Sequence, residues 1–120
     1  MAKTIKSPLR YPGGKSRAIK TILPHIPPND ITEFREPFIG GGSVFLAVKS
    51  QFGSEIETYW INDLNRDLVC FWTMARDENA KLVEAVKNFK ERYADGRELY
   101  AYLKDDGNMR SDFDRAVRFF

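Results

Sequence analysis

Residues 31–48 read ITEFREPFIGGGSVFLAV, and this stretch decides the fold. Its first nine residues are rich in β-branched and aromatic side chains, which predicts a strand over 31–39. The three glycines that follow predict a tight turn, because glycine adopts backbone conformations that other residues avoid. Ser43 then precedes an apolar run at helical spacing and is expected to cap a helix. The stretch therefore predicts a strand, a glycine turn and a helix in succession.

A second strand is expected soon after this helix. Gly53 is placed to end the helix, and the run Ile56–Ile61 predicts a strand that stops at Asn62-Asp63. Two strands joined by a helix predict a right-handed parallel crossover. The expected fold class is therefore α/β.

The segments on either side of this unit differ in character. Before it, a loop rich in proline and glycine leads into a short helical pattern over 19–26, which prolines interrupt. From Asn65 onward only helices are expected, over residues 68–74, 82–93, 99–103 and 113–120. Two parallel strands do not form a stable sheet alone, and the chain ends on the apolar pair Phe119-Phe120 without a cap. We therefore expect the chain to be a truncated part of a larger fold.

The 120 residues are 42% hydrophobic and 30% charged, which is enough for one compact domain. No stretch approaches the ~20 apolar residues of a membrane span, so we expect neither a transmembrane nor a secreted protein and no membrane partner. The single cysteine, Cys70, has no partner for an internal disulfide and is expected to fill a core. A reducing, cytoplasmic location is the expected one.

Positive charge is concentrated near the N-terminus. Residues 1–35 carry seven Lys or Arg against two acidic side chains, a balance of +5, whereas residues 36–120 carry −3. The basic side chains before residue 21 are Lys3, Lys6, Arg10, Lys15, Arg17 and Lys20. They predict either attraction of a nucleic-acid phosphate backbone or an ordinary solvated surface, and charge alone does not separate the two.

The glycine turn and Asp63 form the strongest candidate site. Glycines let a ligand approach the backbone closely, and an acid at the end of the second strand accepts hydrogen bonds from both ribose hydroxyls of a nucleoside. Asp63 follows Gly40 by 23 residues, which fits this arrangement. A plain tight turn would also explain the glycines, but the surrounding strand and helix pattern favours a nucleoside cofactor.

Details of the sequence separate the candidate ligands. Phe45 lies where a dinucleotide fingerprint would have its third glycine, which disfavours NAD. Gly13-Gly14-Lys15-Ser16 matches the end of a phosphate-binding P-loop, but Leu9 stands where that motif needs its first glycine. Glu36 is either a turn-capping acid or a partner for S-adenosylmethionine, which carries an ammonium and a sulfonium and no phosphate. An acid beside the glycine turn therefore suits S-adenosylmethionine better than a dinucleotide.

Three motifs, in order, resemble the Dam-type (D12 class) DNA adenine-N6 methyltransferases. They are Leu9–Lys15 (LRYPGGK), Glu36–Phe45 (EPFIGGGSVF) and Ile61–Asn65 (INDLN). The resemblance implies a Rossmann-like S-adenosylmethionine-dependent methyltransferase fold, here with an incomplete parallel sheet. It also implies site-specific transfer of a methyl group from S-adenosylmethionine to adenine in double-stranded DNA.

The resemblance also assigns roles to residues. Tyr11 would pack its ring against the cofactor, Lys15 would meet the methionyl carboxylate, and Asp63 would hold the ribose hydroxyls. The implied cofactor-binding residues are Tyr11, Gly14, Lys15, Glu36, Phe38, Gly40, Gly42 and Asp63. Each has a structural alternative, such as a loop aromatic for Tyr11, surface charge for Lys15 and strand core for Phe38.

The family's Asp/Asn-Pro-Pro-Tyr/Phe tetrad, which holds a flipped-out adenine, does not occur in the 120 residues. We therefore expect residues 1–65 to be the cofactor-binding part, residues 66–120 to begin the DNA target recognition domain, and the isolated chain to be inactive. The loose similarity of residues 116–120 to a helix of that domain agrees with this division. The alternative is a nucleotide-binding or DNA-binding module without transferase chemistry.

No metal site is expected in this chain. His25 has no second ligand at metal-binding spacing, and Asp105-Asp106-Gly107-Asn108 lacks the closing glutamate of a calcium loop, so it reads as a polar turn. The apolar end at Phe119-Phe120 is expected to be exposed or to drive self-association.

Overall fold

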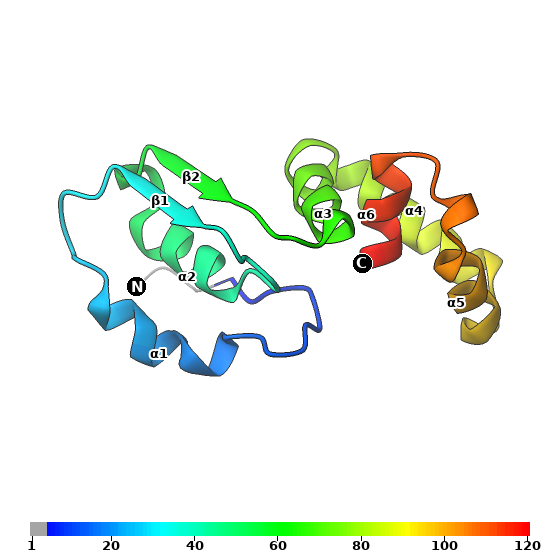
Figure 1. The fold of residues 1–120 in the computed structure, drawn as a ribbon, viewed down its shortest axis with the longest axis horizontal. Helices are drawn as coiled ribbons and strands as arrows, with labels where there is room; N and C mark the ends of the chain where they lie inside the picture. The colour runs from blue at the N-terminus through cyan, green and yellow to red at the C-terminus, as the bar shows by residue number, and fades with distance from the viewer. Residues whose placement is uncertain (1–4) are drawn as a thin grey trace. The chain divides into compact units, whose positions relative to one another are not determined.

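The computed structural model describes residues 5–120, which form two compact units. The first is a mixed α/β unit that ends at Asp63, and the second is a helical unit over Leu64–Phe120 (Figure 1). The sequence suggested a boundary after residue 65, two residues further along.

The first unit contains a two-stranded parallel sheet and short helices. Its elements are η1 Ser16–Ala18, α1 Ile19–Ile22, η2 Leu23–His25, β1 Glu33–Glu36, α2 Ser43–Phe52, η3 Gly53–Glu55 and β2 Thr58–Ile61. The strands pair in register from Glu33 with Thr58 to Glu36 with Ile61. The predicted order of strand, glycine turn, helix and strand, and the parallel pairing, are therefore confirmed.

Both strands are shorter than the sequence pattern suggested, and backbone chemistry explains the end of β1. Pro37 has no backbone N–H and cannot continue the ladder. Two hydrogen bonds nevertheless join the segments beyond the strand ends: the N–H of Asn62 donates to the Glu36 carbonyl (3.0 Å), and that of Ile39 donates to the Asn62 carbonyl (2.8 Å). The glycine turn is thus fixed beside the residues that follow β2.

The ends of α2 are set by two glycines. Gly42, the residue before the helix, has φ +76° in the left-handed region, and the helix begins directly after it at Ser43. Ser43 makes no side-chain cap hydrogen bond, so the prediction that it caps the helix is wrong. Gly53 ends the helix as predicted, with φ +53°.

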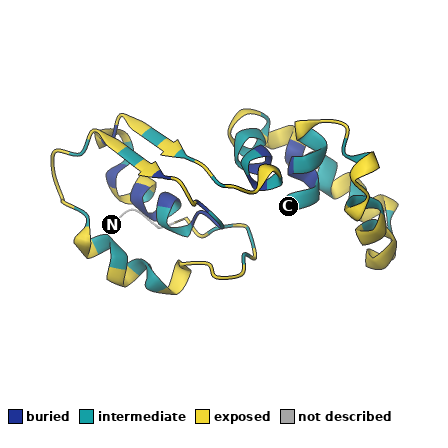
Figure 2. Cartoon of the chain, in the orientation of Figure 1, coloured by how far each residue is buried: buried dark blue, intermediate teal, exposed yellow. Residues whose placement is uncertain are grey.

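The core of the first unit lies along α2. Val48, Phe52 and Ile56 are buried. Figure 2 shows dark blue, buried segments along α2. Partly buried side chains pack around them from η2, the loop before β1, both strands and α2 itself: Leu23, Ile26, Ile31, Phe34, Val44 and Tyr59. The glycine turn directly precedes the N-terminal end of this packed helix.

The helical unit contains the four helices that the periodicity predicted. They are α3 Arg66–Asp77, α4 Asn79–Arg92, α5 Gly96–Lys104 and α6 Asp112–Phe119, with the short η4 Asp106–Asn108. Asn65 caps α3, because its side chain accepts from the N–H groups of Asp67 and Leu68.

The packing of α3 against α6 forms the core of this unit. Leu68, Phe71 and Val117 are buried in it, and Cys70 is buried too, as predicted. Burial raises the pKa of the Cys70 thiol, which keeps it protonated. Phe120 is half exposed and stacks on Phe71 with ring centroids 5.6 Å apart.

None of the helices described within residues 5–120 is long and apolar enough to cross a membrane. His25 is exposed, and no group of three potential metal-ligating side chains occurs in this range. Asp105–Asn108 forms a polar turn, in which the Asp105 carboxylate accepts from the Gly107 N–H.

Asp67 links the helices of the second unit electrostatically. Its carboxylate accepts hydrogen bonds from Arg115 (3.0 Å) and Arg118 (2.7 Å) on α6, and Arg118 also reaches Asp106 (2.7 Å). The three side chains at the centre of this cluster are largely shielded from solvent, with exposures of 17–24%. Asp67 therefore neutralises two partly buried guanidinium groups.

We predict that Asp67→Asn destabilises the helical unit by about 1–3 kcal/mol, because two partly buried cations lose their shared anion. Urea unfolding followed by circular dichroism measures the change. Asp77→Asn is the matched control, since Asp77 is half exposed and pairs only with Arg76 in the described chain, and it should change stability by less than about 0.5 kcal/mol. Equal effects of the two substitutions would contradict the role of Asp67.

Candidate functional site

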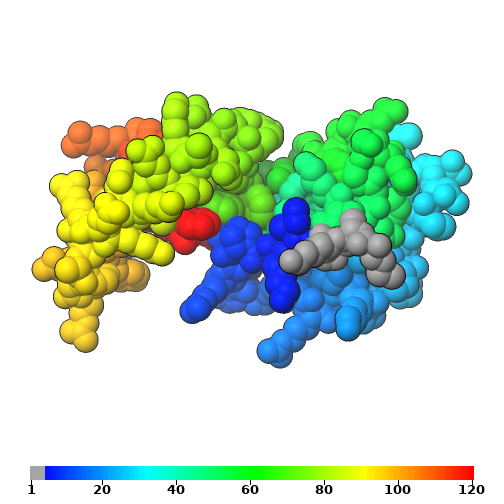
Figure 3. Space-filling model, turned by 180° about the vertical axis from the view of Figure 1, so that it is seen from behind, coloured from blue at the N-terminus to red at the C-terminus, as the bar shows by residue number. Residues whose placement is uncertain are grey.

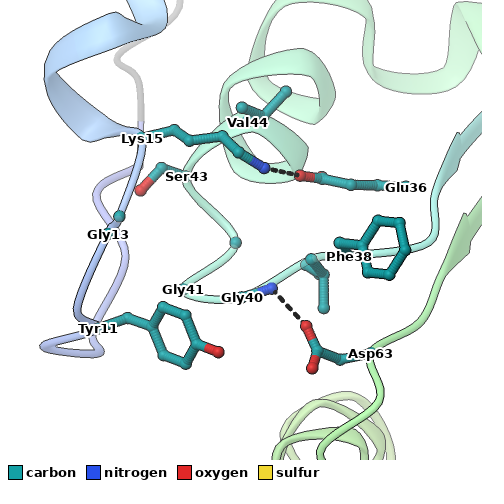
Figure 4. A pocket seen from close by; sticks show the side chains of 13 residues that line it. Tyr11, Gly13, Lys15, Glu36, Phe38, Gly40, Gly41, Ser43, Val44 and Asp63 are labelled. Carbon is teal, nitrogen blue, oxygen red and sulfur yellow. Dashed lines mark hydrogen bonds and ion pairs between the residues drawn. The ribbon is translucent and has the colours of Figure 1, made fainter.

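A cavity of about 240 Å³ lies where the glycine turn meets the N-terminal strap, the name used here for residues 5–15. All eight residues expected to bind a cofactor line it (Figure 4). The lining residues that sequence reasoning missed are Gly13, Ile39, Gly41, Ser43 and Val44. All five lie inside the motifs Leu9–Lys15 and Glu36–Phe45, next to predicted residues. Their position within a motif was the only sequence signal that could have identified them.

The parallel sheet explains why these residues meet. The ends of β1 and β2 emerge at the same edge, which is where open α/β sheets bind ligands. The N–H of Gly40 donates to Oδ2 of Asp63 at 3.0 Å, as the dashed line in Figure 4 shows. Asp63 therefore holds the glycine turn in addition to facing the cavity.

The strap closes the other side of the cavity. The Ser7 hydroxyl donates to the Gly41 carbonyl, and the Leu9 N–H donates to the Ser7 hydroxyl at 3.1 Å. A turn brings the chain back, with the Gly14 N–H donating to the Tyr11 carbonyl at 3.0 Å. These contacts place Tyr11 and Lys15 on the cavity wall.

The glycine turn is shaped by Tyr11. A Cβ atom on Gly40 would lie 3.0 Å from the Tyr11 ring, and one on Gly41 would lie 3.0 Å from the Tyr11 Cβ. Sequence reasoning attributed the absence of side chains to close approach of a ligand. At these two positions in the structure, the space is occupied by Tyr11.

Glu36 and Lys15 form an ion pair on the cavity wall. Lys15 Nζ lies 3.7 Å from Glu36 Oε1, and the Lys15 side chain is 49% exposed whereas that of Glu36 is 11% exposed. The second carboxylate oxygen, Oε2, is buried and has no hydrogen-bond partner among residues 5–120. Buried carboxylate oxygens normally accept hydrogen bonds, so Oε2 is an exception, on a residue that lines the cavity.

Burial dominates the electrostatics of Glu36. It raises the pKa of the carboxyl group above its ordinary value, while the Lys15 ammonium and, to a smaller extent, the backbone amide of Phe45 lower it. A cationic ligand group next to Oε2 would further favour the charged form. The site is therefore suited to a positively charged partner.

Phe38 provides an apolar surface at the cavity. Its side chain is 72% exposed, which rules out the alternative that it is ordinary strand core. Figure 4 shows its ring on the side of the cavity that also carries Glu36 and Asp63. The three charged residues of the lining, Lys15, Glu36 and Asp63, carry a combined charge of −1 when both carboxyl groups are ionised.

Comparison with known proteins agrees with the motifs. The family model of the D12 class N6 adenine-specific DNA methyltransferases matches residues 11–120. The DNA adenine methylase of Vibrio cholerae serotype O1 is 29% identical over 104 residues, which cover 87% of this chain and 35% of the relative.

Two further relatives give the same picture. The DNA adenine methylase of Escherichia coli K12 is 29% identical over 112 residues, covering 92% of this chain and 37% of the relative. The Type II methyltransferase M.MjaIII of Methanocaldococcus jannaschii is 25% identical over 124 residues, covering 95% and 42%. The chain thus spans between 35% and 42% of the length of these relatives. The predicted resemblance to the D12 class is confirmed.

We predict that Glu36→Gln stabilises the ligand-free chain at neutral pH. Because folding raises the pKa of Glu36, the folded chain binds more protons than the unfolded chain above the ordinary value of 4.5, and stability falls as the pH rises through this window. Gln cannot ionise and avoids this loss, so the difference in Tm should disappear below pH 4.5.

Thermal melts of the wild type and the variant across this pH range measure the effect. Glu33→Gln is the matched control, since Glu33 lies on the same strand, is 41% exposed and does not line the cavity. A Tm difference for Glu36→Gln that stays constant with pH would contradict the prediction.

Proposed function

The chain belongs to the D12 class of N6 adenine-specific DNA methyltransferases, and on this premise we propose that its cavity binds S-adenosylmethionine for methyl transfer to adenine in double-stranded DNA. The observation that carries the proposal is the buried, unpartnered Glu36 Oε2 on a cavity wall that also presents Lys15. We further propose that the two-stranded parallel sheet belongs to a Rossmann-like methyltransferase fold.

The charges of the lining support this ligand class. The methionyl end of S-adenosylmethionine carries an ammonium and a carboxylate, and the wall offers an acid and a base 3.7 Å apart to meet them. Glu36 would accept from the ammonium, and Lys15 would meet the carboxylate. A lining charge of −1 also favours a sulfonium compound over a pyrophosphate, which would face two carboxylates.

The remaining lining residues have complementary roles in the proposal. Asp63 would accept hydrogen bonds from the ribose hydroxyls while its Oδ2 keeps the bond to the Gly40 N–H. Phe38 and Tyr11 would offer apolar contacts to the cofactor. When bound, S-adenosylmethionine supplies an electrophilic methyl group on its sulfonium sulfur, and the residues of this chain hold and orient it.

The two units would have different functions. The first unit would bind the cofactor, and the helical unit would begin the domain that recognises DNA. No residue within 1–120 is assigned to holding the target adenine, because the Asp/Asn-Pro-Pro-Tyr/Phe tetrad does not occur there. The proposal for this chain therefore concerns binding and orientation of the methyl donor.

Isothermal titration calorimetry of the full chain with S-adenosylmethionine tests the proposal. Binding is expected, and Glu36→Gln should weaken it at least about tenfold, because a charged hydrogen bond is lost. Glu33→Gln, which leaves the cavity unchanged, should bind like the wild type. Weakened binding together with a raised Tm at neutral pH would distinguish a ligand contact from a folding defect.

Two variants of Asp63 separate its two roles. Asp63→Asn keeps an oxygen that can accept from the Gly40 N–H but loses the charge, whereas Asp63→Ala loses both. Both should weaken S-adenosylmethionine binding, with the larger effect for Ala. Binding of NAD or ATP without binding of S-adenosylmethionine would favour the alternative of a nucleotide-binding module and refute the proposal.

A further inference from the structure

A second cavity, of about 750 Å³, lies against the N-terminal strap and the helical stretch η1–α1. It shares four lining residues with the first cavity: Tyr11, Gly14, Gly41 and Ser43. The two cavities therefore have a common wall made by the strap and the glycine turn. In Figure 3 the dark blue segment near the N-terminus runs over the surface beside the lighter blue of α1.

This second cavity is strongly basic. Its lining contains four cationic side chains, no Asp or Glu, and the apolar side chains of Ile5, Leu9 and Ile19. The four cations are Lys6, Arg10, Arg17 and Lys20. None of them forms an ion pair within residues 5–120, and all four are exposed. An uncompensated set of this kind attracts an anion.

The arrangement of the cations fits an extended anion. Arg17 in η1 and Lys20 in α1 are three residues apart in a continuous helical stretch, which places them on one face. Lys6 and Arg10 come from the strap, a separate segment. Sites for small anions use backbone N–H groups that converge on one point, whereas these charges are spread over two segments of an open surface.

The two cavities differ in the net charge of their lining side chains and therefore favour ligands of opposite charge. The first cavity has a lining charge of −1 and the second has one of +4. A cation-bearing cofactor and a polyanion would each find a complementary site, on either side of the same wall. A DNA strand held in the basic cavity would therefore lie next to the cofactor.

We propose that this basic cavity binds the phosphate backbone of double-stranded DNA, with Arg17 and Lys20 contacting phosphates. The identity of the polyanion rests on the function proposed above. Such contacts position the DNA and carry no base information, because phosphates are the same in every sequence. They would supplement any recognition by the helical unit.

Fluorescence anisotropy of the full chain with a labelled duplex, at several NaCl concentrations, tests the proposal. Arg17→Ala/Lys20→Ala should lower affinity about tenfold or more at 0.1 M salt. It should also reduce the slope of log K against log salt by about 1.8, since each lost phosphate contact removes about 0.9. Arg17→Lys/Lys20→Arg keeps both charges and should retain the wild-type slope.

Arg35→Ala/Lys49→Ala is the matched control. It removes two positive charges from the same unit, but neither residue lines the basic cavity. Its slope should stay close to that of the wild type. Equal slopes for the two double variants, or an unchanged slope for Arg17→Ala/Lys20→Ala, would overturn the proposal.

Two further measurements isolate the inference. By calorimetry, Arg17→Ala/Lys20→Ala should bind S-adenosylmethionine as tightly as the wild type does. If neither the wild type nor any variant binds S-adenosylmethionine, but the salt slope of duplex binding still changes, only the cofactor proposal is refuted.

Replacing chloride by inorganic phosphate at constant ionic strength should leave duplex binding unchanged. Small-anion sites commonly have a Kd on the order of millimolar, so about 10 mM phosphate would occupy such a site. Strong displacement of the duplex by phosphate at this concentration would overturn the assignment to a DNA backbone.

Discussion

The hydrogen bonds of Asn62 are the constraint on which the candidate site depends. Its N–H donates to the Glu36 carbonyl and its carbonyl accepts from the Ile39 N–H, so two segments stay paired after Pro37 has ended the regular ladder. This pairing places the Gly40 N–H within 3.0 Å of the Asp63 carboxylate, across 23 residues of sequence. A parallel sheet of only two strands is sufficient to bring the glycine turn and the acid together, because α2 packs firmly against it.

Glu36 links the stability of this unit to its chemistry. A carboxyl group with one oxygen buried and unpartnered costs the ligand-free fold free energy, as the raised pKa indicates. In the proposed function, the Glu36 carboxylate would meet a cationic group of the ligand. Natural binding sites often retain such locally unfavourable groups, because a site complementary to its ligand is rarely optimal when empty.

The N-terminal strap organises both cavities at once. Ser7 ties it to the Gly41 carbonyl, and Tyr11 packs on the glycine turn where any side chain would collide with it. The cavity with Glu36 and Asp63 and the cavity with Arg17 and Lys20 share Tyr11, Gly14, Gly41 and Ser43 in their linings. The strap and the glycine turn thus line two cavities of opposite charge.

The sequence by itself determined the features that depend on near neighbours. Gly53 ends α2, and the apolar periodicity predicts four helices after Asn65, because helix-ending glycines and helical faces are encoded within a few residues. The order and spacing of the motifs also predicted that Gly40 and Asp63 lie in one site, and the two residues are hydrogen-bonded in the structure. Only the tertiary structure decided that Tyr11 fills the space above Gly40 and that Glu36 keeps an unpartnered oxygen. These features arise from contacts between segments distant in the chain, whose packing and burial no local pattern specifies.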